Sequence, residues 1–184
     1  SEYFAKGREW KWCQWSLVMG ILGLGLGCDQ VQSAYEDPKI PVNKDAGGKV
    51  ALVNSPIVQA ARSQIGKTVI YDPAYVGLKY PGGDVPIERG VCTDVVIRAL
   101  RKGVGLDLQK LVHEDMKKAF AKYPKIWSLK KSDRNIDHRR VPNLSRYFER
   151  KGYSLGVSKN KDDYLAGDIV TCSVIKRPHI MIVS

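Results

Sequence analysis

Apolar residues recur at intervals of three and four along four stretches of the chain, which is the pattern of amphipathic helices. The predicted helices span residues 56–65, 92–102, 107–122 and 142–151. Ser55 is a favourable N-cap for the first helix, and Pro56 suits its first position. Pro124 stops the third helix, and glycines predict the ends of the others at Gly66, Gly103 and Gly152.

Short runs rich in β-branched residues predict three strands, at residues 68–71, 168–174 and 179–184. The last two runs are joined by the four residues 175–178 and predict a hairpin. Helices that precede antiparallel strands predict an α+β domain with its helices on one face of the sheet. The chain ends at the last residue of a predicted strand, Ser184. Because three short strands make a small sheet, we expect further strands beyond this residue.

Residues 1–28 differ in pattern from the rest of the chain. Basic residues in the first eleven positions precede a charge-free run from Cys13 to Cys28 that is rich in Leu and Gly. This run is too short for a confident membrane span and predicts a secretory signal. Residues 24–28 resemble a bacterial lipobox, so Cys28 is a candidate for lipidation, and simple secretion stays an equal alternative. Residues 29–54, with scattered Pro and Gly, predict a linker to a domain at 55–184.

A hydrophobic content of 43% and a charged content of 27% are those of a globular protein. The formal net charge of +11 favours polyanions, either wall polymers and phospholipids in an envelope or nucleic acid in a cytoplasm. Basic residues lack aromatic interleaving, so we expect no nucleic-acid binding. Cys92 and Cys172 are the cysteines outside the signal, and a disulfide between them stays open. No metal-ligand spacing or phosphate-binding loop is present, so we expect neither metal nor cofactor.

Candidate chemistry lies in Cys92, which opens a predicted helix, and His179, which begins a predicted strand. Helix N-terminal amides and a neighbouring imidazole favour the thiolate and make it a good nucleophile. The alternatives are a small buried thiol and a histidine of the core or sheet edge. His138 competes as the base, since it follows Asp137 in the dense polar run 133–140. The arginines of that run either clamp carboxylates or belong to a solvated loop.

Several segments together resemble a bacterial family, domain of unknown function 1287. They are residues 71–75, 80–86, 90–99, 107–109, 113–116, 133–144 and 167–170, followed by His179. That family is similar to the papain-like NlpC-type and CHAP-type amidases and peptidases, which cleave amide bonds of peptidoglycan. The resemblance implies a papain-like NlpC-type fold with Cys92 as nucleophile and His179 as base. It also implies that Tyr71 lies beside the active site and that a third catalytic residue follows Ser184. The chain departs from the pattern at Ala166, Cys172 and Met181.

These observations predict an exported cysteine amidase or peptidase that acts on peptidoglycan in the periplasm or envelope. The alternative is a non-catalytic envelope-binding or scaffold module on the same fold. We expect a monomer whose partner is peptidoglycan or another anionic wall polymer, with membrane contact only through a lipid anchor. The expected substrate-binding residues are Tyr71, Asp94, Asp137, His138 and Arg139.

Overall fold

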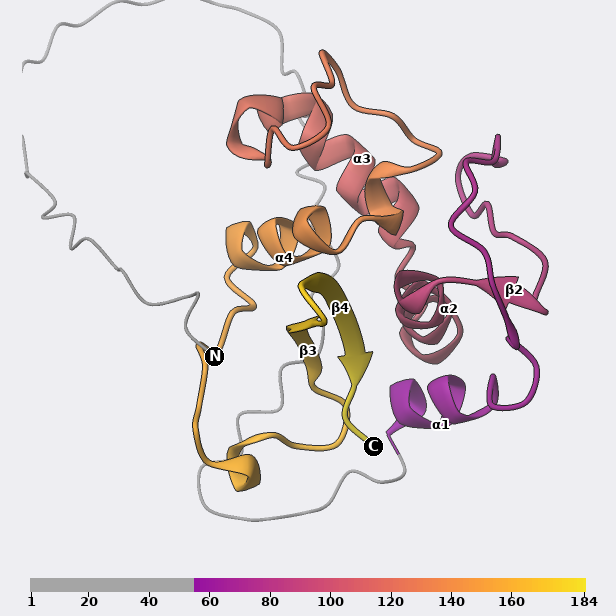
Figure 1. The fold of residues 1–184 in the computed structure, drawn as a ribbon, viewed down its shortest axis with the longest axis vertical. Coiled ribbons are helices and arrows are strands. Elements are labelled where there is room, and N and C mark those ends of the chain that lie inside the picture. Colours follow the sequence, from indigo (N-terminus) through magenta and orange to yellow (C-terminus); the bar gives the residue numbers. More distant parts are fainter. Residues whose placement is uncertain (1–54) are drawn as a thin grey trace, which may run out of the picture. The chain divides into compact units, whose positions relative to one another are not determined.

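The computed structural model describes residues 55–184. The predicted signal peptide, the lipidation candidate Cys28 and the linker lie outside the described residues. The helices are α1 (Pro56–Arg62), α2 (Cys92–Val104), α3 (Leu108–Ala119) and α4 (Val141–Arg150), with short 3₁₀ turns η1 (Phe120–Lys122), η2 (Asp137–Arg139) and η3 (Lys161–Asp163). The strands are β1 (Ile70–Tyr71), β2 (Arg89–Gly90), β3 (Ile169–Val174) and β4 (Arg177–Ile182) (Figure 1).

All four predicted helices are present, but three predicted ends are wrong: α1 and α3 stop three residues early, at Arg62 and Ala119, and α2 runs past Gly103. The Ser55 hydroxyl accepts the Val58 N–H at 3.2 Å, as an N-cap should, and Pro56 is the first residue of α1. α2 continues past Gly103 and ends at Gly105, whose φ of 72° is left-handed. A Cβ at Gly103 would lie 2.7 Å from the Pro56 carbonyl oxygen. Gly103 therefore permits the close approach of α1 to α2 and does not cap a helix.

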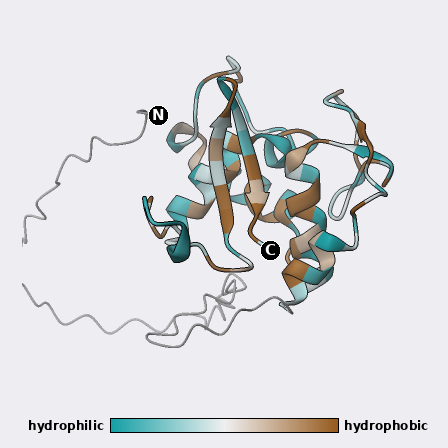
Figure 2. Ribbon diagram, turned by 60° about the horizontal axis from the view of Figure 1, so that its bottom comes forward, coloured by the Kyte–Doolittle hydropathy of each residue, from teal (hydrophilic) through white to brown (hydrophobic). Residues whose placement is uncertain are grey.

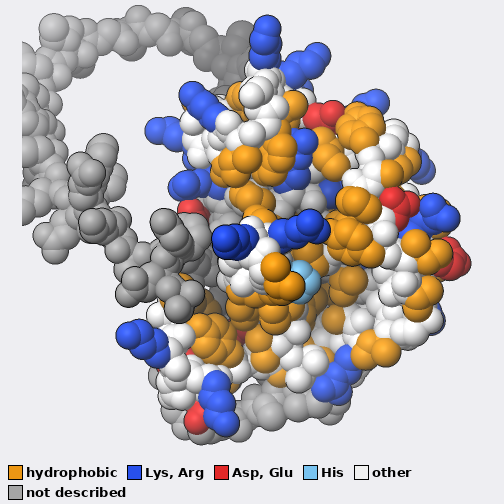
Figure 3. All heavy atoms as spheres, viewed as in Figure 1, with side chains coloured by type: hydrophobic (Ala, Val, Ile, Leu, Met, Phe, Trp, Pro, Cys, Tyr) orange, Lys and Arg blue, Asp and Glu red, His pale blue; other side chains and the backbone are white. Residues whose placement is uncertain are grey.

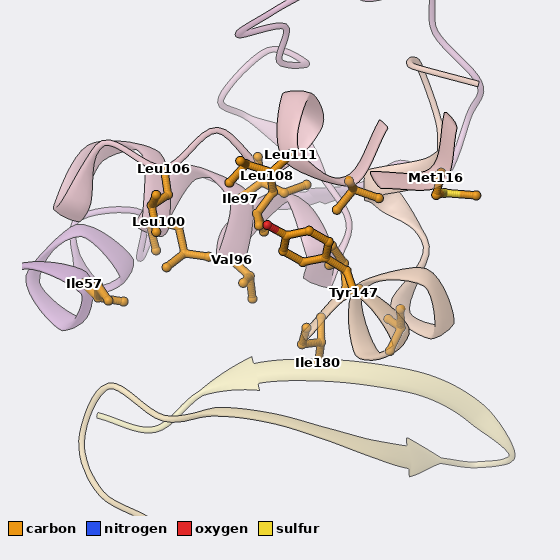
Figure 4. Packing of buried hydrophobic residues seen from close by; sticks show 14 of the residues in the cluster. Ile57, Val96, Ile97, Leu100, Leu106, Leu108, Leu111, Met116, Tyr147 and Ile180 are labelled. Atoms are coloured by element: carbon orange, nitrogen blue, oxygen red, sulfur yellow. The ribbon is translucent and has the colours of Figure 1, made fainter. Parts of the chain in front are cut away.

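The core lies between the helices and the hairpin. Ile180 of β4 is buried and belongs to the same apolar cluster as Val96 of α2 and Tyr147 of α4 (Figure 4). α2 and α4 both contact β4. Hydrophobic and hydrophilic residues are interspersed along the helices behind the hairpin, as amphipathic helices require (Figure 2). None of the helices within residues 55–184 has the length and hydrophobicity of a membrane span.

The predicted hairpin is confirmed, but its turn is tighter than expected. β3 and β4 are antiparallel, and Cys172 lies opposite His179. The turn consists of Ile175 and Lys176, whose φ values of 48° and 62° are those of a two-residue hairpin turn. The four-residue connection was wrong because Arg177 and Pro178 already pair with β3. His179 is consequently the third residue of β4 and not the first.

A second, parallel ladder was not predicted. β1 pairs with β2 through Ile70–Arg89 and Tyr71–Gly90. β1 lies within the predicted strand at residues 68–71, but it pairs with β2 and not with the hairpin, and β2 is too short to leave a hydrophobic period in the sequence. Helices combined with two small sheets are consistent with the predicted α+β class.

Candidate active site at the start of α2

Cys92 is a half-buried free thiol at the first position of α2. Cys172 is also free, so the alternative of a disulfide between them is wrong. The turn before Cys92 is tightly constructed. The Asp94 carboxylate accepts the Val91 N–H at 2.7 Å, and a Cβ at Gly90 would lie 2.9 Å from an oxygen of that carboxylate. Gly90, with φ of 154°, therefore leaves space for the cap that precedes Cys92.

His179 is partly buried on β4, the strand that α2 contacts. Side chains alternate along a strand, so the burial of Ile180 against the helices directs His179 and Met181 to the opposite face. Met181 is 40% exposed, in agreement with this alternation. Within residues 55–184, no hydrogen bond joins His179 to the thiol of Cys92. The fold thus brings the two elements together without joining their side chains.

Tyr71 lies beside the turn that carries Cys92, because its backbone pairs with Gly90. Its side chain is 71% exposed. The next residue, Asp72, donates its N–H to the Gly90 carbonyl at 3.1 Å and pairs through its carboxylate with Arg89 at 3.2 Å. A backbone hydrogen bond from Ala74 is the main factor that lowers the pKa of Asp72. The segment that follows Tyr71 is thus attached to the turn before Cys92 through a backbone hydrogen bond and a side-chain ion pair.

Asp94 and Arg139 form a buried bidentate ion pair. Arg139 Nε lies 2.9 Å from one Asp94 oxygen and Nη2 lies 3.0 Å from the other. The side chains are only 4% and 2% exposed. Arg139 also donates to the carbonyls of Ala74 and Asp72, at 3.0 and 3.3 Å, while its own carbonyl accepts the Thr93 hydroxyl. Direct contact of Asp94 and Arg139 with substrate stays a prediction, which this burial disfavours.

Asp137 and His138 lie in η2, which contacts α2, α3 and α4, and both side chains are buried. Desolvation raises the pKa of Asp137 to about 6 and lowers the pKa of His138 to about 4. Asp137 accepts the Asp133 N–H and lies 3.9 Å from the Arg140 guanidinium. The solvated-loop interpretation is therefore wrong for residues 137–139, which three helices enclose, whereas Arg134 is exposed. His138 is closed to solvent, which disfavours it as the base or as a substrate contact.

A hollow of about 460 Å³ borders β1 and β2. Apolar side chains and three charged groups line it: Ile70, Val76, Val85, Pro86, Asp72, Glu88 and Arg89. It is a partly open depression, and Cys92 is not among the residues that line it, although β2 ends two residues before Cys92. On the face drawn in Figure 3, hydrophobic side chains gather near the hairpin, with Lys and Arg spread around them. Among residues 55–184, no cluster of His, Cys, Asp and Glu has the arrangement of a metal site.

The sequence interpretation missed Arg98, a buried residue of α2. Its guanidinium contacts the Asp84 carboxylate at 2.8 Å and the Thr68 hydroxyl at 3.0 Å, and it donates to three carbonyls between residues 85 and 89. These contacts hold the segment that leads into β2. The available signal was an arginine within the apolar positions of a predicted helix, where a charge needs a partner.

Comparison with known proteins agrees with the segments that resemble domain of unknown function 1287. Residues 58–184 match the family model described as "Domain of unknown function (DUF1287)". The chain belongs to this family. It is 64% identical over 121 residues to "Uncharacterized protein YijF" of Escherichia coli (strain K12). The match covers 66% of this chain and 58% of that relative, so the chain spans little more than half the relative's length. No solved structure matches the chain. The predicted DUF1287 membership is confirmed.

Proposed function

We propose that this DUF1287 chain is an exported cysteine hydrolase that cleaves amide bonds of bacterial peptidoglycan. The observation that carries the proposal is the position of Cys92, a free and partly exposed thiol at the first residue of α2. First-turn amides of a helix have no intrahelical acceptor and stabilise negative charge. The turn is held in one geometry by the buried Asp94–Arg139 pair.

In the proposed reaction, the Cys92 thiolate attacks the amide carbonyl carbon and forms a tetrahedral intermediate. The backbone N–H of Cys92 donates to the oxyanion. The carbon–nitrogen bond then breaks, and the amine leaves with a proton from the protonated base. Water attacks the resulting thioester, the base takes a proton from it, and the acid product and free thiol are released.

His179 is the proposed base. It is supported by the contact between α2 and β4 and by the resemblance to NlpC-type enzymes. Because His179 faces away from the helices, a rearrangement of the hairpin is required to bring its imidazole to the thiol. Catalytic hydrogen bonds are often long in the absence of substrate and shorten in the complex. Export rests on the pattern of residues 1–28, and binding to the wall rests on the positive net charge.

The deciding experiment compares the release of soluble peptides from purified peptidoglycan by the wild-type chain, Cys92→Ser and the matched control Cys172→Ser. We expect Cys92→Ser to abolish release, since an alcohol at this position is a far weaker nucleophile than a thiolate. Cys172→Ser should retain it, because Cys172 takes no part in the proposed reaction, even though it lies opposite His179 on the hairpin. Release that survives in Cys92→Ser contradicts the proposal. A wild-type chain that binds peptidoglycan but releases nothing supports the alternative of a non-catalytic binding module.

A further inference from the structure

Besides its contacts to α2 and α3, the polar run that begins at Asp133 makes several hydrogen bonds to one distant segment, residues 72–79. The Asn135 side chain accepts the Leu78 N–H at 3.0 Å and donates to the Tyr75 hydroxyl at 2.8 Å. The Tyr75 hydroxyl in turn donates to the Asp133 carboxylate at 3.0 Å. Together with Arg139, these residues attach the segment at its beginning, middle and end.

Arg139 joins this attachment to the turn of Cys92. The same guanidinium that holds the Asp72 and Ala74 carbonyls also holds the Asp94 carboxylate. Asp94 caps the backbone just before Cys92. A planar guanidinium can satisfy a carboxylate and two carbonyls at once, whereas a lysine ammonium has no such fork. Arg139 is thus the common member of both sets of contacts.

We propose that residues 133–139 form a clamp that fixes segment 72–79 against the Cys92 turn, with Arg139 as the positioning residue that maintains the reactivity of the thiol. The inference rests on the proposed function of Cys92. Its electrostatic reason is that Arg139 balances the Asp94 carboxylate. An unpaired carboxylate two residues from the thiol would disfavour the thiolate. Its geometric reason is that segment 72–79 directly follows Tyr71, which pairs with the residue two before Cys92.

The clamp gives residues 133–139 a role that the local sequence pattern does not reveal. Every contact in it joins residues at least 45 positions apart, from Arg139–Asp94 to Arg139–Asp72. Arg139 does not face solvent, so it acts on chemistry through Asp94 and segment 72–79 and not by touching substrate.

The test measures alkylation of Cys92 by iodoacetamide in the full chain, with site-resolved mass spectrometry across a range of pH. Cys172, an exposed thiol on β3, is an internal reference in the same sample. We expect Arg139→Met to slow Cys92 labelling about tenfold near neutral pH, because the Asp94 carboxylate is then unpaired beside the thiol. Arg139→Lys keeps the positive charge but loses the planar guanidinium. Its Cys92 labelling rate should therefore lie between those of wild type and Arg139→Met. The Cys172 rate should not change in either variant.

One further variant, with its own control, keeps the test decisive if the Arg139 variants do not fold. Tyr75→Phe removes only an exposed hydroxyl that contacts the clamp. It should speed amide hydrogen exchange across residues 72–79 and slow Cys92 labelling without lowering the thermal midpoint. Arg146→Met on α4, whose surface ion pair with Glu149 is outside the clamp, is the matched control and should change neither readout.

The outcomes separate the clamp from the proposed function. A wild-type Cys92 that labels no faster than Cys172 overturns the proposed function. A fast wild-type Cys92 whose rate is the same in folded Arg139→Lys and Tyr75→Phe overturns the clamp. Slower Cys92 labelling in these variants, with Cys172 unchanged, supports it.

Discussion

Asp137 and His138 are adjacent buried residues whose ionisation is shifted by the same cause. Burial disfavours the charged form of each, so the pKa of Asp137 is raised to about 6 and the pKa of His138 is lowered to about 4. An oxygen of Asp137 and the Nδ1 of His138 have no hydrogen-bond partner in the described part of the chain. The free energy of unfolding should therefore depend on pH through both residues. The contribution of Asp137 is lost as pH rises, and that of His138 is lost as pH falls.

Replacing Asp137 by Asn should remove a pH-dependent loss of stability. The raised pKa means that the contribution of the carboxyl group is fully present below its unfolded pKa of 3.8 and is lost as pH rises through about 6. Asp137→Asn should therefore gain stability over wild type between these values, by up to about 3 kcal/mol. Urea unfolding at several pH values measures this difference. A difference that does not change with pH would contradict the prediction.

His138→Gln should show the opposite dependence. The lowered pKa means that the stability due to neutral His138 is present above its unfolded pKa of 6.5 and is lost as pH falls through about 4. The variant loses buried contacts at every pH, so only the change in the difference is informative. Relative to wild type, His138→Gln should become more stable as the solution is acidified from pH 6.5 to about 4, in the same unfolding series.

Gly103 allows the backbones of α1 and α2 to come into contact. Ala is a better helix former than Gly by about 1 kcal/mol, so Gly→Ala inside a helix usually stabilises. At Gly103 the added methyl would lie 2.7 Å from the Pro56 oxygen and 2.9 Å from the Ile57 Cα, and backbone atoms cannot rotate away. The sequence placed a helix end here because a glycine after a helical period is ordinarily a cap.

Gly103→Ala should accordingly destabilise the domain, by about 1–3 kcal/mol as for other overpacked sites. Thermal and urea unfolding measure the loss, and hydrogen exchange in α1 should become faster as the helix moves away. Lys118→Ala, at an exposed position of α3 outside this contact, is the control and should stay within about 0.5 kcal/mol of wild type. An increase in stability for Gly103→Ala would show that the two helices are not in contact.

The hairpin turn combines a demanding geometry with unsuitable residues. Ile175 and Lys176 both adopt left-handed backbone conformations, and Ile175 is 91% exposed, so its side chain contributes little packing. Asn followed by Gly is the preferred pair for such a turn. The double variant Ile175→Asn, Lys176→Gly should raise the free energy of unfolding by about 1–2 kcal/mol. Denaturant unfolding checks this value, and no gain would indicate a different turn conformation in solution.

The whole molecule has a formal net charge of +11. Attraction between such a surface and an anionic polymer weakens with salt, because the Debye length falls from about 10 Å at 0.1 M to about 3 Å at 1 M. Binding of Cys92→Ser to purified anionic peptidoglycan should therefore decrease when NaCl is raised from about 0.05 M to about 0.5 M. Cosedimentation measures the bound fraction, with chitin as an uncharged control polymer. Equal binding to both polymers at all salt concentrations would contradict an electrostatic contribution.

The sequence alone determined the helices, the hairpin and the membership of DUF1287. Amphipathic helices depend on residues a few positions apart, so the Ser55 cap and the apolar period of α2 were sufficient to place α1 and α2. The strand alternation of Ile180 and Met181 was likewise readable. The placement of Cys92 at the first residue of a helix followed from the same local rules.

Only the tertiary structure decided which polar residues are buried and which segments meet. The polar run at 133–139 has the composition of a solvated loop, and only the packing of three helices around it encloses Asp137 and His138. The ladder between β1 and β2 and the pairing of Asp94 with Arg139 join residues far apart in sequence, whose partners no local period specifies. The physical reason is that charge burial and long-range pairing depend on the whole fold, whereas helix and turn formation depend on neighbours along the chain.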